Sequence, residues 1–419
     1  MTSQVITLNR LGVAVASDSI STITDMNDNY IASVQNTQKV FDLGPKHKLL
    51  IVNSDNMSIS GSPISTLLSA WANTLEDAKP KVWDYLESFL DWLESQPQEH
   101  FPDMPIEFRN FIYDQLRPIS ESMEKVFPTF RPFAETTLEV IANSPEFARS
   151  YRRTLAIKVN AFLKQIESNR AQVFIDQDLP GNLQEAAQKT ACMLLDTDAI
   201  VDLWFPDETI PKATKKRLKT NIYKLINHVP VQQVESLCRL SFVGYGSEEI
   251  FPKLFEVGIQ SKQYGIVRWR GLGSAEVETN KRSEIYLMAQ TSAIMNFLDG
   301  VHPKFLADIK ASIPLAVVED RQADFEDPSE FSEDEREVWL GIGDSVTNKL
   351  EKYIHGFKEK NRSGIADRLD FMGTSELAHM AKSLLALEIL ATLKDSGPST
   401  VGGEIVSATI DHKNGVAWL

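Results

Sequence analysis

The stretch Thr2-Ser-Gln-Val-Ile-Thr-Leu-Asn-Arg-Leu-Gly-Val-Ala-Val-Ala-Ser-Asp-Ser19 decides the fold of this 419-residue chain. Both halves are β-rich, and a tight turn near Arg10-Leu11 lets the first half pair back on the second as an antiparallel hairpin. Residues whose numbers sum to about 21 or 22 then lie opposite each other, which brings Thr2 close to Asp18. In the second strand, small alanines share the face of Asp18, so there is space for another group beside its carboxylate.

Strand-like segments continue after this hairpin and return late in the chain. Further β-rich runs, separated by turn residues, lie at 38–43, 48–52, 239–245, 251–259, 264–270, 284–290, 405–411 and 416–419. From Ile64 to about Gln233, apolar residues recur at three- and four-residue spacing with prolines as breaks, which predicts a helical excursion. The expected fold class is therefore α+β, a two-sheet core with helices outside and an inserted all-α region.

The later helices and the domain boundaries follow from the same patterns. One helix is expected to stop at Gly300, and another to begin at an N-cap Thr374 and end at Gly397-Pro398. The stretch 319–337 holds ten acidic side chains against two arginines, which is typical of a solvated linker or loop. The expected domains are therefore one unit over 1–63 and 236–419, with an acidic linker and extra helices at 318–373, and a helical insertion over 64–235.

The composition argues against several classes of function. Lysine and arginine number 43 against 58 aspartates and glutamates, a net charge of −15, which disfavours nucleic acid and anionic membrane as partners. No apolar stretch approaches the ~20 residues that span a bilayer, and the first ten residues lack the features of a signal peptide, so a cytoplasmic location is expected. The two cysteines, Cys192 and Cys238, have apolar neighbours, and the seven histidines never stand at metal-ligand spacing. Neither a metal nor a cofactor is expected.

Three residues of the opening segments form a candidate catalytic cluster, namely Thr2, Asp18 and Lys39. Removal of Met1, which is usual when a small residue follows it, would make Thr2 the first residue. An N-terminal threonine combines a hydroxyl nucleophile with an α-amine of ordinary pKa ~7.7–8.0, which is partly neutral at pH 7. A nearby lysine ammonium lowers the pKa of that amine by like-charge repulsion, while Asp18 holds the lysine charged and oriented. The amine is thereby tuned as a general base.

The first 40 residues of the chain resemble the opening of proteasome β-type subunits and their bacterial relatives. The segments that carry the resemblance are Thr2-Ser3, Gly12-Val-Ala-Val-Ala-Ser-Asp-Ser19, Tyr30-Ile-Ala-Ser33 and Gln38-Lys-Val40. Later, residues 399–410 and 415–418 resemble the final strands of the family, and 242–255 and 288–300 are similar to a bacterial branch of it. The resemblance implies a four-layer αββα sandwich of the N-terminal-nucleophile (Ntn) hydrolase type and the hydrolysis of peptide bonds.

The resemblance also implies roles for individual residues. Thr2 would be the nucleophile and the amine base, Asp18 the orienting partner of the lysine, and Lys39 the electrostatic tuner. The oxyanion-hole amide is expected just after the strand that follows the lysine, and Ser54 is its candidate, with Gly61 as the competitor.

Two features depart from the family pattern or stay open. Where the family has glycine at the oxyanion position, this chain has Asn53-Ser54. The hydroxyls that normally support the nucleophile have four candidates, which are Thr291, Ser292, Ser399 and Thr400.

The leading hypothesis is a threonine-type peptidase that acts on polypeptides and assembles into a homo-oligomer with enclosed active sites. An ATP-dependent unfoldase or another protein is then a candidate partner. The alternative is a proteasome-like scaffold without peptidase activity, whose helical insertion binds another protein. A third hypothesis on the same fold is an amidase that acts on a small amide.

Overall fold

The structure is a computed structural model. It describes residues 2–24, 30–103, 106–107, 110, 116–117, 119, 121–123, 125–126, 145–168, 197–205, 210–221, 237–263, 266–279, 281–324, 331–393 and 401–419. Cys192, Ser399, Thr400 and the expected helix end at Gly397-Pro398 lie outside these residues.

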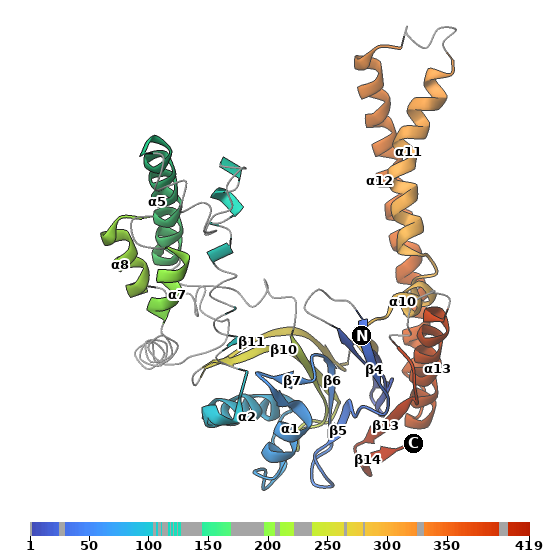
Figure 1. Ribbon diagram of the computed structural model, residues 1–419. Helices are drawn as coiled ribbons and strands as arrows, with labels where there is room; N and C mark the ends of the chain where they lie inside the picture. Colours follow the sequence, from blue (N-terminus) through green and yellow to red (C-terminus); the bar gives the residue numbers. More distant parts are fainter. Residues whose placement is uncertain are drawn as a thin grey trace.

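Two five-stranded antiparallel sheets form the body of the molecule (Figure 1). The first sheet has the strand order β12-β1-β2-β13-β14, and the second has the order β11-β10-β9-β6-β5. The strands of the first sheet are β1 Ser3–Asn9, β2 Gly12–Ser17, β12 Ser283–Ala289, β13 Val406–Asp411 and β14 Gly415–Trp418. Those of the second sheet are β5 Val40–Asp42, β6 Leu49–Asp55, β9 Cys238–Gly244, β10 Lys253–Gln263 and β11 Ile266–Glu276. Two small hairpins pair β3 (Ser21–Thr24) with β4 (Tyr30–Val34) and β7 (Ser58–Ile59) with β8 (Ser62–Pro63).

The first hairpin has the register that the sequence predicts. Gln4 lies opposite Ser17 and Asn9 opposite Gly12, so the paired numbers sum to 21, and the turn falls at 10–11. The prediction of the hairpin and of its turn is therefore confirmed.

Apolar side chains from both sheets meet in one core between them. Val13 and Val15 of β2 point into this core, together with Leu50 and Val52 of β6. The alternate β2 residues, Ala14 and Ala16, lie in the clusters on the other face of the first sheet. Both faces of β2 are thus buried, which explains why its sequence is a continuous run of small and apolar residues.

Helices cover the outer face of each sheet (Figure 1). Those on the first sheet are α10 Ser292–Asp299, α13 Thr374–Thr392 and the last turns of α12 Glu333–Leu369. Those on the second sheet are α1 Ile64–Ala72 and α2 Val82–Ser95, where Trp71 and Phe89 pack edge-on against each other and next to Phe242 of β9. Trp71 is fully buried, and the helical stretch that begins at residue 64 starts with two helices that cover a sheet.

A second group of helices follows α2 and a short 3-10 helix (Gln98–His100). This group, which we call the helical arm, consists of α5 Pro145–Ser168, α7 Thr197–Trp204 and α8 Lys212–Asn221. Tyr151, Leu155 and Val159 form the apolar stripe of α5, and they are buried in the same cluster as Leu218 of α8. Their spacing of four residues is that of one helix face.

The helical hairpin is formed by α11 (Pro303–Gln322) and α12 (Glu333–Leu369), and it projects far from the sheets (Figure 1). At 1.5 Å per residue, the 37 residues of α12 extend over about 55 Å. The prediction of a linker or loop over 319–337 is therefore wrong at both ends, since 319–322 and 333–337 are helical. Ser332 caps α12 in a reciprocal pair with Glu335, and acids in the first turn are stabilised by the helix dipole, so the acidic run marks a helix start.

A close approach between α11 and α12 fixes their packing at Gly343. A Cβ atom at this position would lie 2.5 Å from the Cα of Pro314, whereas a Cβ at Gly341 would meet nothing within 4 Å. We expect Gly343→Ala to destabilise the hairpin by about 1–3 kcal/mol through this overlap. The control Gly341→Ala should instead stabilise it by ~0.5–1 kcal/mol through helix propensity. Hydrogen exchange of the α11 and α12 amides measures both effects, and equal shifts of the same sign in the two variants would contradict the packing.

Two expected helix ends can be compared with the structure, the start of α13 and the end of α10. The N-cap of α13 is Gly373 and not Thr374, and Glu376 accepts the Gly373 N–H at 2.9 Å. Helix α10 ends as expected at Gly300, whose φ of 69° is in the left-handed region. Among the described residues, no helix is both long and apolar enough to cross a lipid bilayer.

Candidate active site

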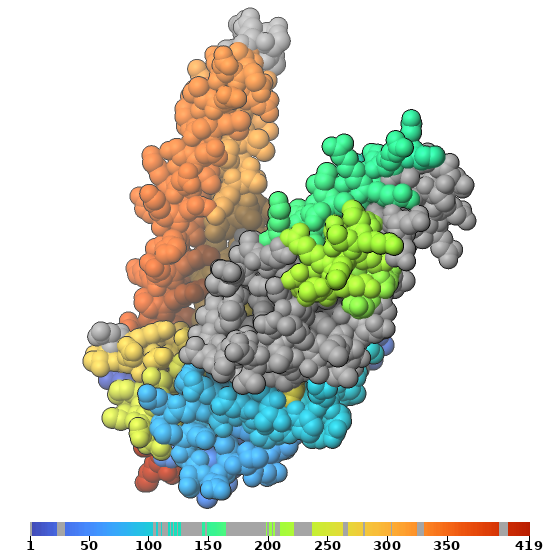
Figure 2. Space-filling view, turned by 90° about the vertical axis from the view of Figure 1, so that its left-hand side faces the viewer, coloured from blue at the N-terminus to red at the C-terminus, as the bar shows by residue number. Residues whose placement is uncertain are grey.

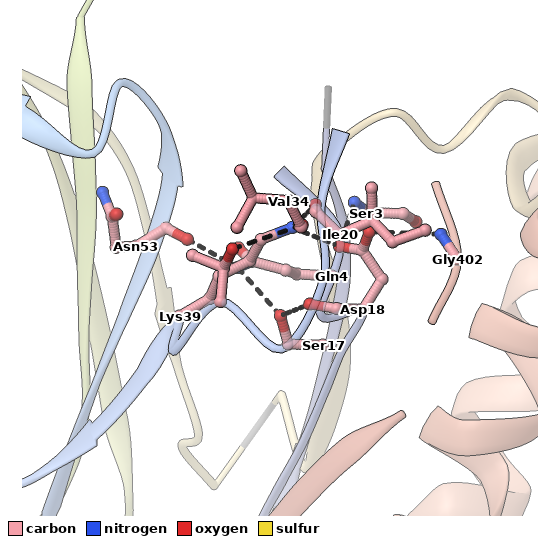
Figure 3. Close-up of polar contacts among 10 residues, drawn as sticks. Ser3, Gln4, Ser17, Asp18, Ile20, Val34, Lys39, Asn53 and Gly402 are labelled. Carbon is pink, nitrogen blue, oxygen red and sulfur yellow. Dashed lines mark hydrogen bonds and ion pairs between the residues drawn. The ribbon is translucent and has the colours of Figure 1, made fainter. Parts of the chain in front are cut away.

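A buried ion pair joins the ends of two strands from different sheets. Asp18 follows β2 directly and Lys39 directly precedes β5, and Lys39 Nζ lies 2.8 Å from Asp18 Oδ1 (Figure 3). The two residues are 1% and 2% exposed. The structure thus brings together two of the four predicted site residues, and it does so away from solvent.

Backbone groups complete the surroundings of the pair. Asp18 Oδ1 also accepts the Ser3 N–H at 3.1 Å, and Asp18 Oδ2 accepts the Gly402 N–H at 3.3 Å. Lys39 Nζ donates a second hydrogen bond to the carbonyl oxygen of Ile20. Because these contacts come from several segments, the positions of both charged groups are fixed by the fold.

Burial shifts the pKa values of Asp18 and Lys39 in opposite directions. It lowers the pKa of Lys39 below the ordinary 10.5, and it raises the pKa of Asp18 above the ordinary 3.8. The ion pair opposes both shifts, and the Ser3 and Gly402 N–H groups oppose the rise in the pKa of Asp18 further. The ion pair with Asp18 therefore favours the charged form of the lysine, whereas burial disfavours it.

Thr2 precedes Ser3, the residue whose N–H binds Asp18, and is itself buried, at 4% exposed. Its carbonyl oxygen accepts the Gln290 N–H at 2.8 Å, and the next residue, Ser3, binds Asp18. The segment around Thr2 is thus held between the end of β12 on one side and Asp18 on the other.

A chain of hydrogen bonds that the sequence analysis missed connects the pair with the second sheet. Gln4 Nε2 donates to the Asn53 carbonyl at 2.6 Å and to Ser17 Oγ at 3.2 Å, and Ser17 Oγ donates to the Asp18 carbonyl at 3.1 Å (Figure 3). Gln4 and Ser17 stand at inward positions of strands whose other inward residues are apolar, such as Ile6. Polar residues at inward positions of otherwise apolar strands could have indicated this network, because a buried polar side chain needs a hydrogen-bond partner.

Ser54 lies inside β6 and not in a loop after it. The strand extends to Asp55, three residues beyond the predicted end, because β9 pairs with it over its full length and places Arg239 opposite Ser54. Ser54 is fully buried, and its Oγ has no hydrogen-bond partner among the described residues. The competitor Gly61 has a φ of 85° in the turn between β7 and β8, and its close neighbours are Pro102 and Asp103. Ser54, which follows the Asn53 carbonyl bound by Gln4, is thus linked to the cluster, whereas no contact among the described residues links Gly61 to it.

The candidates for a supporting hydroxyl lie at the start of α10. Thr291 and Ser292 follow Gln290, the residue that binds the Thr2 carbonyl. Ser292 Oγ donates to Glu388 Oε1 at 3.3 Å, while Glu388 Oε2 accepts the backbone N–H groups of 293 and 294. Glu388 therefore caps α10 and the Ser292 hydroxyl is bonded to this carboxylate, whereas Thr291 makes no side-chain capping bond.

Comparisons of the sequence with protein-family models and with curated proteins find no match in either case. The site is therefore interpreted from its own geometry. It contains a buried ion pair of Lys39 and Asp18, and a hydroxyl residue, Thr2, next to the residue whose N–H binds Asp18.

Proposed function

We propose that this protein is a threonine-type peptidase of the N-terminal-nucleophile class, in which Thr2 becomes the first residue once Met1 is removed. The observation that carries the proposal is the buried Asp18–Lys39 ion pair, bonded through Asp18 to the amide of the residue that follows Thr2. A structural role alone rarely favours such a pair, because the desolvation of two charges offsets much of their attraction. A charge that tunes a neighbouring amine gives the pair a chemical use.

The reaction follows from the groups present. The neutral α-amine of Thr2 takes the proton of the Thr2 hydroxyl while Oγ1 attacks the carbonyl carbon of the substrate peptide bond. The C–N bond then breaks, the proton passes to the leaving amine, and an ester on Thr2 remains. A water molecule hydrolyses this ester, with the same amine as base. Lys39 lowers the pKa of the amine, and a backbone N–H near Ser54 would stabilise the oxyanion.

The architecture supports the same proposal. Two antiparallel sheets that share a core, each covered by helices on its outer face, are the arrangement expected of a four-layer αββα Ntn-hydrolase sandwich. We further propose that the substrate is a polypeptide, that the enzyme works in the cytoplasm as a homo-oligomer with enclosed sites, and that an ATP-dependent unfoldase or another protein delivers the substrate.

The decisive experiment controls when the α-amine of Thr2 becomes free. The full chain is produced with a removable leader that ends immediately before Thr2, and a mixed peptide library is offered before and after the leader is cut. Hydrolysis is expected only after cutting, because a peptide bond at the Thr2 nitrogen removes the base. Intact mass confirms the new terminus, and a leader-bearing protein that hydrolyses peptides as fast as the cut protein would overturn the mechanism.

The alternative of an inactive scaffold is favoured by one observation, the position of Asn53-Ser54 inside a paired strand. The same experiment separates the two candidates. A folded protein with a verified Thr2 terminus that hydrolyses no peptide and no small amide would establish the scaffold.

A further inference from the structure

The helical arm carries an excess of positive charge in an acidic protein. Its helices α5, α7 and α8 contain ten lysines and arginines against four aspartates and glutamates, while the whole chain has a net charge of −15. Part of this charge is neutralised inside the arm, since Asp202 lies 2.7 Å from Lys215 and 2.8 Å from Lys219.

Five basic side chains of the arm are exposed and have no ion pair with any residue that the structure describes. They are Arg149, Arg153 and Lys164 of α5, and Lys212 and Lys216 of α8. Figure 2 shows α5 and the α7–α8 segment exposed on the face turned toward the viewer. The arm thus presents an outward basic surface.

The far end of the helical hairpin presents the opposite charge. Within the described part of this end, six exposed acids have no ion pair with a described residue. They are Glu319 and Asp320 of α11, and Glu333, Asp334, Glu335 and Glu337 of α12, against one exposed basic residue without such an ion pair, Arg336. Figure 2 shows that the outer part of the hairpin stands clear of the body of the molecule in that view. The two surfaces therefore carry net charges of opposite sign.

Exposed apolar residues continue both charged surfaces. On α12, Val338, Ile342 and Val346 follow Asp334 at intervals of four residues, and the first is 62% exposed. On α5, Ile157 follows Arg153 at the same interval and is 59% exposed. Because residues four apart share one helix face, each surface is a charged end joined to an apolar stripe.

We infer that the acidic end of the helical hairpin docks on the basic helical arm of a second copy of this chain. Figure 1 shows the arm and the hairpin on opposite sides of the sheets, projecting in the same direction. Copies placed side by side would bring the hairpin of one next to the arm of the following one. Since the two surfaces differ, the contact is heterologous and each copy offers both halves, which gives a ring or an open chain of copies.

The charge distribution favours this partner over a nucleic acid. A polyanion drawn to the arm would also meet the net negative charge of the chain and the acidic hairpin end. The hairpin end supplies anionic and apolar groups together, which complement the basic and apolar groups of the arm, and every copy of the chain carries both surfaces.

The test reverses charge on each surface separately. The hairpin variant is Glu319→Lys, Asp320→Lys and Glu337→Lys, and these positions are chosen because lysine at the end of α11 and beyond the first turn of α12 does not oppose the helix dipole. The arm variant is Arg149→Glu, Lys212→Glu and Lys216→Glu, which places glutamates near helix starts. Sedimentation velocity of the full chain at low salt is expected to show that each variant dissociates at least about tenfold more readily than wild type.

The two variants then rescue each other. Mixed together, or combined as six substitutions in one chain, they restore opposite charges across the contact and are expected to recover the wild-type assembly. The control Asp91→Lys, Asp308→Lys and Asp367→Lys makes the same change in net charge at exposed acids away from the hairpin end and should leave the assembly unchanged. A monomeric wild type at low salt, a hairpin variant with wild-type mass, a mixture without rescue, or an arm variant that loses only nucleic-acid binding would each overturn the inference. None of these outcomes depends on peptidase activity.

Discussion

Thr2→Ala abolishes peptide hydrolysis, and Thr2→Ser retains it within about tenfold of wild type; these are the outcomes expected if the hydroxyl of Thr2 is the nucleophile. Alanine keeps the terminal amine, and with it the base, but has no oxygen to attack the carbonyl. We expect the loss of turnover to be at least about 10³-fold, the scale seen when a covalent nucleophile is removed. Serine keeps the hydroxyl and lacks only a methyl group.

The measurement is steady-state turnover of a peptide library, with intact mass to verify that residue 2 is the first residue in every variant. All three residue types at position 2 are small, so removal of Met1 is expected to be the same. Ser3→Ala is the matched control, because the Ser3 N–H to Asp18 is retained and Ser3 Oγ has no hydrogen-bond partner among the described residues. The assembly should be unchanged in each variant. Turnover of Thr2→Ala at the wild-type rate would eliminate the mechanism.

The sequence predicts those parts of the fold that depend on neighbours in the chain. The register from Gln4 and Ser17 to the turn at 10–11 follows from local alternation and a short turn. The strand-like runs at 405–411 and 416–419 are likewise found as β13 and β14, which form a hairpin around Gly415 with its φ of 73°. Both hairpins pair segments that are joined directly.

The features that the sequence does not predict depend on distant partners. The end of β6 at Asp55 is set by β9, whose strand begins at Cys238. The hairpin of α11 and α12 is missed because its acidic end resembles a solvated loop in composition, while its packing depends on the contact of Gly343 with Pro314. A polar composition indicates that a segment is exposed to solvent. It does not distinguish a long exposed helix from a solvated loop.

The candidate site also has features that the sequence predicts and features that it does not. That Asp18 could meet Lys39 follows from strand order, but the contributions of Gln4 and Gly402 do not, because they come from hydrogen bonds between segments that the sequence leaves unplaced. The expected strand end at residue 52 places Ser54 in a loop, whereas β6 continues to Asp55.

Replacing one member of the buried ion pair should destabilise the protein strongly, and the two single variants should respond to pH in opposite directions. Lys39→Met leaves the Asp18 carboxylate buried without its cation, and Asp18→Asn leaves the Lys39 ammonium buried without its anion. Either change is expected to lower the free energy of unfolding by about 3–5 kcal/mol at neutral pH, the scale for an uncompensated buried charge. The double variant, which buries no charge, should be more stable than either single variant.

The signs of the pH effects follow from the two pKa directions. In Lys39→Met, the ion pair no longer opposes the rise in the pKa of Asp18, so the folded state binds a proton that the unfolded state releases above about 3.9. Stability is then greatest in acid and is lost as the pH rises through the raised pKa. In Asp18→Asn, the pKa of Lys39 falls further, so the unfolded state binds the extra proton and stability is gained as the pH rises. Denaturant unfolding of the double and single variants at several pH values measures both slopes. Parallel slopes in the two single variants would mean that the two groups are not charged partners in the folded protein, and the proposed tuning of the Thr2 amine by Lys39 would lose its basis.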